Sequence, residues 1–246
     1  MKDENKKIGK DTLYRATDEP VKPFEFNKRV VDVFPDMIER SVPGYPLTIS
    51  MIGVMADDYV QDNTNVYDLG CSLGAVSLAI QQGLKNKKCN IKAVDNSQAM
   101  IDACIENIPN ENNDIEFILN DVLDVDIVNA SVVVMNFTLQ FIPVEQRKSL
   151  IEKIYNGLLP SGVLILSEKI KFEDKVENET MNHLHHHMKE LNGYDKLEIA
   201  SKREALEDVL VPESIDAHIT RLNDSGFENA FVWLKCFNFI SLVAIK

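Results

Sequence analysis

The sequence has few basic residues and no long apolar run, and each shortage excludes a class of protein. Among 246 residues, 26 Lys and Arg stand against 39 Asp and Glu, so the formal net charge is -13. Proteins that hold duplex nucleic acid neutralise its phosphates with a basic surface, so this balance disfavours direct tRNA or DNA binding. No stretch of about eighteen apolar residues is present, and the polar N-terminus lacks the apolar core of a signal peptide. We therefore expect no membrane association and no export.

Cysteines are also few, and no two of the four form a Cys-x-x-Cys pair. This excludes the common spacing of zinc ligands and a disulfide framework, and it is typical of the reducing cytosol. The histidines at 185–187 do not indicate a metal, because successive side chains on a helix point about 100° apart. His183 and His187 are better spaced, but no His-Glu-x-x-His motif accompanies them. We therefore expect a cytoplasmic protein without a metal.

The first 28 residues are polar and are predicted to form a flexible arm, followed by a single domain over 29–246. Apolar residues recur at helical spacing over 27–40 and over 47–59. Beyond these, short apolar runs typical of buried strands alternate with amphipathic stretches typical of helices. The predicted strands cover 65–70, 90–95, 115–119, 130–137 and 163–168, and the predicted helices cover 74–83, 97–107 and 144–159.

Strands that alternate with helices at this spacing predict an α/β fold, an open and mostly parallel sheet with helices on both faces. Pro160, Ser161 and Gly162 are expected to separate the last of these helices from the strand that follows it. Residues 172–224 are charged and helical in pattern, and we interpret them as an insertion into this fold. Two β-rich runs over 227–246 are expected to close one edge as a hairpin, which brings the sheet to seven strands.

The segment 67–74, YDLGCSLG, carries the most specific local pattern, an acidic strand end followed by small residues at alternate positions. Glycine permits a tight turn and a close approach of ligand to backbone, and the next helix offers free N–H groups at its start. Ligands of open α/β sheets lie at this end of the strands. A plain strand-to-helix turn without a ligand would also use such a segment.

Three kinds of ligand site compete for this segment. A dinucleotide site needs Gly-x-Gly-x-x-Gly, and only Gly70 and Gly74 are present. A hydrolase nucleophile elbow, Gly-x-Ser-x-Gly, matches 70–74 literally. However, no oxyanion-hole stretch precedes it, and Asp68 would place a carboxylate beside the developing oxyanion. An S-adenosylmethionine site, Asp-Leu-Gly-x-Ser-x-Gly, fits the segment best.

Polar residues at further strand ends favour the S-adenosylmethionine site. Asp95 ends the second predicted strand, where a carboxylate can accept hydrogen bonds from ribose hydroxyls; an acid at a helix N-terminus is the plainer alternative. Asp121 and Val122 follow the third strand, where a side chain and a backbone N–H can contact an adenine edge. Asn136 ends the fourth strand. Because the carboxyl ends of parallel strands meet at one edge, we predict that these residues share one cleft.

These motifs resemble those of class I S-adenosylmethionine-dependent methyltransferases, which have a Rossmann-like sheet of this kind. Longer segments are similar to the carboxy-S-adenosyl-L-methionine synthase family over nearly the whole chain, from about residue 10 to residue 246. The segments that carry this resemblance are RSVPGY, YDLGCSLGA, DNSQAM, NFTLQF, LSEK, LNGY, SKREALE and WLKCFNFISLVAIK.

The resemblance implies that the chain converts S-adenosyl-L-methionine and prephenate to carboxy-S-adenosyl-L-methionine and phenylpyruvate. A separate tRNA carboxymethyltransferase would then use the product to modify the wobble uridine (cmo5U). The resemblance also implies a homodimer. The residues that it assigns to the ligand are Tyr45, Gly70, Cys71, Ser72, Asp95, Asn96, Asp121, Val122, Asn136 and Arg203, with Arg203 and Tyr45 as the predicted catalytic residues.

Arg203 suits an added carboxylate, because a guanidinium is planar, permanently charged and able to donate two parallel hydrogen bonds. Without the resemblance, we would interpret this arginine as an exposed partner in helical ion pairs. Prephenate is a dianion, so further basic residues are expected near it, and the candidates are Arg40, Lys169 and Lys171. Tyr194 and the nearby histidines are candidates for the lining of the same cleft.

Other functions stay open at this point. A small-molecule methyltransferase would share every S-adenosylmethionine contact and differ only in its acceptor. A tRNA methyltransferase is disfavoured by the charge of -13. A non-catalytic S-adenosylmethionine-binding module would bind the ligand without turnover, so a carboxylated nucleoside that forms only with prephenate distinguishes the synthase from all three.

Overall fold

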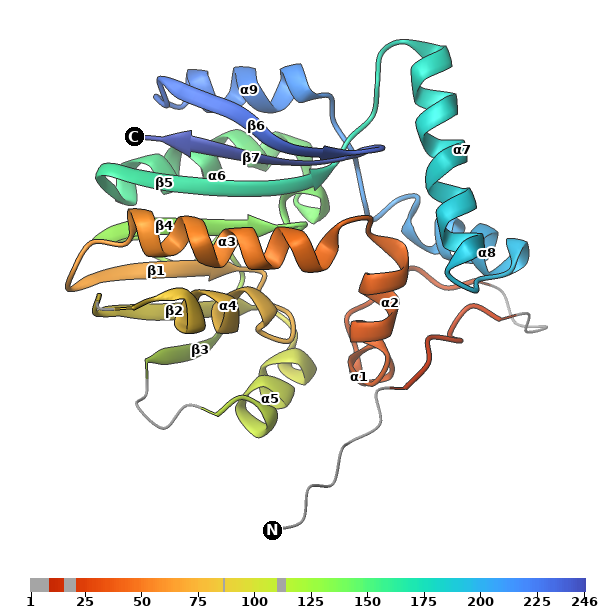
Figure 1. Cartoon of the computed structure of the whole chain (residues 1–246), viewed down its shortest axis with the longest axis horizontal. Coiled ribbons are helices and arrows are strands. Elements are labelled where there is room, and N and C mark those ends of the chain that lie inside the picture. The colour runs from red at the N-terminus through yellow and green to blue at the C-terminus, as the bar shows by residue number, and fades with distance from the viewer. Residues whose placement is uncertain (1–8, 16–20, 86, 110–113) are drawn as a thin grey trace.

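The computed structural model describes residues 9–15, 21–85, 87–109 and 114–246, and these form one seven-stranded sheet in the order β3-β2-β1-β4-β5-β7-β6 (Figure 1). The five strands from β3 to β5 pair in parallel, whereas β7 lies antiparallel between β5 and β6. The predicted mostly parallel sheet is therefore confirmed. The strands are β1 (Thr64–Leu69), β2 (Cys89–Asp95), β3 (Ile115–Leu119), β4 (Ala130–Asn136), β5 (Leu158–Lys169), β6 (Asn229–Cys236) and β7 (Phe239–Ile245).

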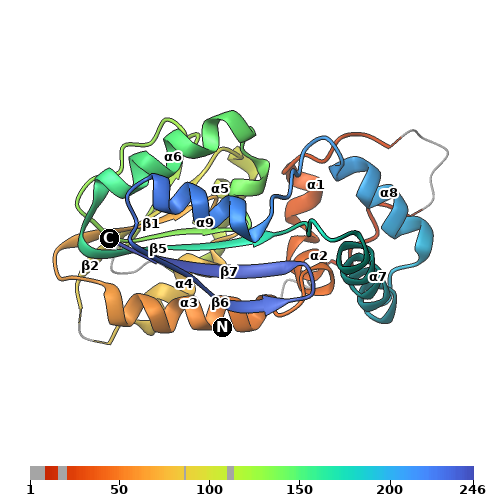
Figure 2. The same ribbon diagram turned by 90° about the horizontal axis from the view of Figure 1, so that it is seen from above.

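Helices cover both faces of the sheet (Figure 2). On one face, α3 (Tyr45–Tyr59), α4 (Ala75–Gly83) and α5 (Gln98–Asn107) share a hydrophobic core with alternate residues of the strands. On the other face, α6 (Val144–Gly157) and α9 (Ile215–Asp224) pack on the remaining strand residues. Six of the seven residues of β4 are buried, as a strand covered on both faces requires.

The boundary between α6 and β5 differs from the prediction. Pro160, Ser161 and Gly162 lie inside β5 and do not interrupt it, because the strand begins directly after α6. The pairing with β4 shifts register here, and Ser161 adopts a positive φ of 63° while its N–H donates to the carbonyl of Lys246. The three residues therefore form a local irregularity of the strand, which is where proline and non-helical backbone are tolerated.

The predicted helix over 27–40 is divided in two, α1 (Lys28–Val31) and α2 (Phe34–Ser41). Pro35 stands in the first turn of α2, where its missing N–H costs nothing, but it could not continue a helix from α1 without breaking a backbone hydrogen bond. The next helix, α3, begins at Tyr45 and includes Pro46 in its first turn.

Two helices between β5 and β6, α7 (Lys175–Leu191) and α8 (Lys196–Leu206), stand beyond the carboxyl ends of the parallel strands, beside α1 and α2 (Figure 1). We call α7 and α8 the roof helices. Phe24 is buried and its N–H donates to the carbonyl of Ala205, so part of the predicted arm lies on α8. Residues 1–8 and 16–20 fall outside the described residues, and the division into an arm and one domain with an insertion stays a prediction.

Candidate active site

A cavity of about 1520 Å³ opens at the carboxyl ends of the parallel strands, beneath the roof helices. A site for one drug-sized ligand usually measures about 300–1,000 Å³, so this cavity has room for a nucleoside and a second small molecule. All ten residues predicted to contact the ligand line it: Tyr45, Gly70, Cys71, Ser72, Asp95, Asn96, Asp121, Val122, Asn136 and Arg203. Their roles in binding or catalysis stay predictions.

The loop after β1 has a shape that only glycine permits at its first position. Gly70 has a φ of +81°, and a Cβ on it would lie 2.3 Å from Oγ1 of Thr138. The N–H groups of Gly70 and Cys71 both donate to the carbonyl of Val94, and the N–H of Ser72 donates to Asp95. These N–H groups fix the loop against β2 and are therefore not available to an anion.

Asp95 is held by backbone groups on both sides of its carboxylate. Its two oxygens accept hydrogen bonds of 2.9 Å from the N–H groups of Ser72 and Ser97, and burial raises its pKa. Ser97 also caps α5, as the sequence predicts, by accepting a hydrogen bond from the N–H of Met100. The carboxylate of Asp95 therefore stands at the end of β2 in a fixed orientation, as an acceptor for ribose hydroxyls requires.

Asp68 is buried at the end of β1 and accepts hydrogen bonds from the first turn of α4. It is 1% exposed, and its Oδ2 accepts hydrogen bonds from both the N–H and the hydroxyl of Ser77 in the first turn of α4. Burial raises its pKa to about 7. The hydroxyl of Ser72 donates to the sulfur of Met100 and not to a histidine, so the geometry of a hydrolase nucleophile elbow is missing here.

Two further strand ends present acceptors to the cavity. Oδ1 of Asn136, at the end of β4, is buried and has no hydrogen-bond partner among the described residues. Buried polar atoms are nearly always paired, so this oxygen indicates a ligand that donates to it. After β3, Asp121 accepts from the N–H of Leu123, which shapes the adjoining turn. With the close-approach loop at Gly70 and the carboxylate of Asp95, these acceptors fit the donor groups of an S-adenosylmethionine molecule.

Tyr45 approaches the cavity from the first turn of α3. Its ring lies 6.3 Å from that of Phe137, centroid to centroid, and burial together with the charge of Asp68 raises its pKa. The phenol is therefore neutral at physiological pH and can donate one hydrogen bond. Phe137 itself has a positive φ of 62°, which the N–H bond to the carbonyl of Ser167 maintains.

Basic side chains gather at the roof side of the cavity. Lys169 at the end of β5, His185, His186 and Lys189 on α7, and Lys202 beside Arg203 on α8 all line it. His185 is buried, makes a 2.8 Å hydrogen bond from Nε2 to the carbonyl of Ser41, and has its pKa lowered to about 3 by burial, so it is neutral. Lys169 and Arg203 were predicted from the sequence as partners of an anionic ligand, whereas Lys189 and Lys202 were not.

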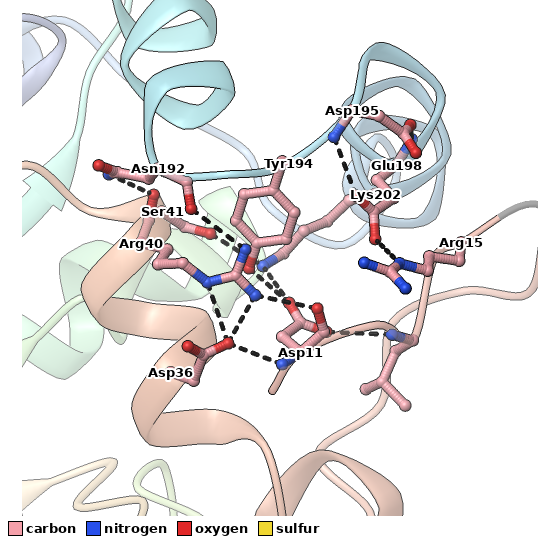
Figure 3. Close-up of polar contacts among 11 residues, drawn as sticks. Asp11, Arg15, Asp36, Arg40, Ser41, Asn192, Tyr194, Asp195, Glu198 and Lys202 are labelled. Carbon is pink, nitrogen blue, oxygen red and sulfur yellow. Dashed lines mark hydrogen bonds and ion pairs between the residues drawn. The ribbon is translucent and has the colours of Figure 1, made fainter. Parts of the chain in front are cut away.

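Arg40 is not part of the cavity lining, which corrects its assignment as a substrate-binding candidate. Its guanidinium donates to Asp36 and to the carbonyl of Asp11, and it lies 3.9 Å from the ring centroid of Tyr194 (Figure 3). The hydroxyl of Tyr194 in turn donates to Asp11 over 2.6 Å. Arg40 and Tyr194 therefore hold the N-terminal segment to α2 and the roof helices.

Lys171, the third basic candidate, is exposed and also lies outside the cavity lining. Within the described part of the chain, no group of three His, Cys, Asp or Glu side chains could hold a metal ion. The rings of His183 and His187 stack with their centroids 6.5 Å apart. Among the same residues, none of the helices combines the length and apolar character that a membrane crossing needs.

Residues 66–162 match the family model described as a methyltransferase domain. A carboxy-S-adenosyl-L-methionine synthase of Pseudoalteromonas translucida is 49% identical, over 96% of this chain and 99% of that protein. One of Shewanella baltica is 48% identical, over 97% of this chain and 99% of that protein. The solved structure of human N-acetylserotonin methyltransferase in complex with SAM is similar in fold, with a TM-score of 0.61 over 89% of this chain and 55% of that one, at 14% identity.

Proposed function

Since the chain belongs to the carboxy-S-adenosyl-L-methionine synthase family, we propose that it converts S-adenosyl-L-methionine and prephenate to carboxy-S-adenosyl-L-methionine and phenylpyruvate. In this reaction the methyl carbon exchanges one C–H bond for a C–C bond to the carboxyl group that prephenate loses. The ring hydroxyl of prephenate departs with the methyl proton as water, and the ring becomes aromatic. Aromatisation supplies the driving force.

The residues that would contact S-adenosyl-L-methionine by hydrogen bonds come from the ends of β2, β3 and β4. Asp95 would accept from the ribose hydroxyls, Asp121 and Val122 would contact the adenine, and the orphaned Oδ1 of Asn136 would accept from a donor of the ligand. When bound, the sulfonium supplies an acidified methyl group. The observation that carries the proposal is the assembly of all ten predicted contact residues in one cavity that has room for two molecules.

Arg203 would receive the new carboxylate. It lines the cavity from α8, and its pairing with a carboxylate through two hydrogen bonds is stronger than a contact between neutral groups. Tyr45 would contribute one hydrogen bond from its neutral phenol on the α3 side. The roof helices would exclude water, which protects a carbon nucleophile from reprotonation.

The cellular setting of this reaction is also a proposal. We expect a cytoplasmic homodimer whose product is used by a separate tRNA carboxymethyltransferase, without direct contact between this chain and nucleic acid. The net charge of -13 and the four unpaired cysteines support this setting. A small-molecule methyltransferase is the alternative, because it would use the same S-adenosylmethionine contacts.

The test is an incubation of purified protein with S-adenosyl-L-methionine, with and without prephenate, followed by mass spectrometry of the nucleoside. We expect a carboxylated nucleoside together with phenylpyruvate, only in the tube that contains prephenate. Arg203→Ala should lower this turnover about 10- to 100-fold, since it removes a charged hydrogen-bond partner. Unchanged nucleoside in both tubes would reject the synthase activity and favour the methyltransferase or a binding module.

A further inference from the structure

Two lysines of the cavity wall, Lys169 and Lys189, lie outside the ion pairs of the described residues, and Asp11 acts on the charge of Lys189 only from a distance. Lys189 is only 6% exposed, and neither ammonium makes an ion pair or a hydrogen bond among the described residues. The contact of Lys189 is with the ring of Tyr194, 5.5 Å from Nζ to the centroid. A buried ammonium without a partner is costly, so such groups are normally paired or face a ligand.

Lys202 lines the same wall of the cavity but, unlike Lys169 and Lys189, has polar partners within the protein. Its Nζ donates to Oγ of Ser41 over 3.1 Å and lies 3.7 Å from Oδ2 of Asp11 (Figure 3). Asp11 also accepts the hydroxyl of Tyr194, so its carboxylate is already occupied. Lys202 therefore holds the N-terminal segment in place, whereas the ammonium groups of Lys169 and Lys189 hold no other part of the described chain.

The positive charges of the basic residues in this wall also repel one another. Burial lowers the pKa of Lys169, and the charge of Arg203 lowers it further. Burial lowers the pKa of Lys189 to about 7, with added repulsion from Lys202 and Lys169. The chain has a net charge of -13 and therefore many carboxylates, yet none of those described forms an ion pair with Lys169 or Lys189. An anionic ligand that enters between these side chains would relieve both the repulsion and the burial cost.

We propose that Lys169 and Lys189 form a separate subsite that binds the two carboxylates of prephenate, the carboxyl donor, before transfer, and that Arg203 is left for the carboxylate formed on the nucleoside. The two lysines come from different elements, the end of β5 and the last turn of α7, and both line one cavity. A ligand with two carboxylates can engage both, whereas a monoanion engages one. This inference rests on the proposed function, and it names the residues that select a dicarboxylic carboxyl donor.

The experiment measures equilibrium binding of prephenate by calorimetry to protein saturated with S-adenosylhomocysteine, which has no methyl group to react. Lys169→Met and Lys189→Met should each weaken prephenate binding about 10- to 100-fold, as expected for the loss of one charged hydrogen bond. S-adenosylhomocysteine affinity should change by less than about twofold. Lys169→Arg and Lys189→Arg should recover part of the loss because they keep the charge.

The matched control is Lys171→Met, an exposed lysine of the same segment outside the cavity, which should leave prephenate affinity unchanged. Methionine preserves the apolar stem of lysine and removes a buried charge, so the folded state is retained and a melting curve checks this. Unaltered prephenate affinity in both cavity variants would overturn the inference. A wild-type protein that binds prephenate through these lysines but forms no carboxylated nucleoside would instead reject the proposed function and leave the subsite in place.

Discussion

Single residues decide the shape of the loop that follows β1. Gly70 combines a φ of +81° with a Cβ position only 2.3 Å from Oγ1 of Thr138, so a residue with a side chain would be strained in its backbone and would also clash with Thr138. Gly193 shares the first property, with a φ of +89°, but has no atom within 4 Å of its Cβ position. Alanine variants of Gly70 and Gly193 can therefore separate the two contributions to the loss of stability, namely the strained backbone conformation and the steric clash.

Gly193→Ala should lower the free energy of unfolding by about 1–2 kcal/mol, the usual cost of a left-handed alanine. Gly70→Ala should cost more and should also weaken S-adenosylmethionine binding, because Thr138 and the loop must move apart. Urea denaturation and calorimetric titration measure the two effects. Equal stability losses in the two variants, with ligand affinity retained in both, would contradict the close approach at Gly70.

Asp68 predicts a pH dependence of stability. Burial raises its pKa to about 7, well above the value near 3.8 of an exposed aspartate. Between about pH 4 and 7 the folded state therefore holds a proton that the unfolded state has lost, so stability falls as the pH rises through this window. Asp68→Asn removes the titrating group, and the unfolding free energy of the wild type should decline relative to this variant from pH 4 to pH 7.

The control for this slope is Asp36→Asn. Burial opposes the ionisation of Asp36, but its hydrogen bonds with Arg40 and the N–H of Asp11 outweigh burial and lower its pKa. Its stabilising effect is lost only as the pH falls through that lowered value, so it adds no slope between pH 5 and 7. Urea midpoints at several pH values test both variants, and parallel wild-type and Asp68→Asn curves would contradict the buried neutral acid.

The site residues at strand ends could be predicted from the sequence, because an apolar run followed by a glycine or an acidic residue marks the end of a strand. Asp95 and Asn136 were found in this way and line the cavity. Lys189 has no comparable local pattern, since it faces the cavity only because α7 stands over the strand ends. Arg40 was misassigned because its charge is visible in the sequence, whereas its pairing with Asp36 and Asp11 depends on the fold.

At the scale of elements, Arg147 joins three parts of the chain from a fully buried position on α6. Its guanidinium donates to the carbonyls of Gln140 and Ile142 in and beside the short 3-10 helix η1 (Leu139–Phe141), and to the carbonyl of Val211. It also pairs with Glu213, in the connection that leads to α9. This single side chain therefore anchors a part of the cavity floor to the segment that follows the roof helices.

Arg147→Met should lower the free energy of unfolding by about 3–5 kcal/mol, because it leaves the carbonyls of Gln140, Ile142 and Val211 without their donor and removes one of the two arginines that pair with Glu213. Lys148→Met, on the next residue, removes an exposed pair with Asp224 and should cost less than about 1 kcal/mol. Chemical denaturation of both variants gives the comparison. A similar small loss in both would show that the buried arginine contributes little to holding these elements together.

Element positions followed from periodicity wherever apolar runs were uninterrupted, as in β3, whose bounds match the prediction. The errors occurred at proline. Pro160 was expected to end a structured region but lies in a strand irregularity, and Pro35 was overlooked although it starts a new helix. The pairing of β5 with β4 decides the first case, whereas the restriction that proline places on a helix is local and would have predicted the second.

For the whole molecule, the excess of acidic residues predicts the absence of a tRNA complex. With a net charge of -13, titration of tRNA with the protein in about 0.15 M salt should give no saturable binding, because long-range repulsion opposes the approach of phosphates. Filter binding or fluorescence anisotropy measures this. A saturable complex that weakens steeply as salt is added would favour a tRNA methyltransferase over the synthase.

The placement of the roof helices has a consequence for the rates at which backbone amides exchange with deuterium. The residues of β4 and of β5 from Gly162 to Glu168 are mostly buried in the centre of the sheet, so their amides exchange through unfolding of the whole domain. Helices α7 and α8 expose apolar side chains such as Leu191 and Leu197 and meet α2 and the N-terminal segment through polar contacts such as Tyr194 with Asp11. Their amides should therefore exchange by local opening, and a ligand that spans β5 and α7 should slow deuterium uptake first in α7.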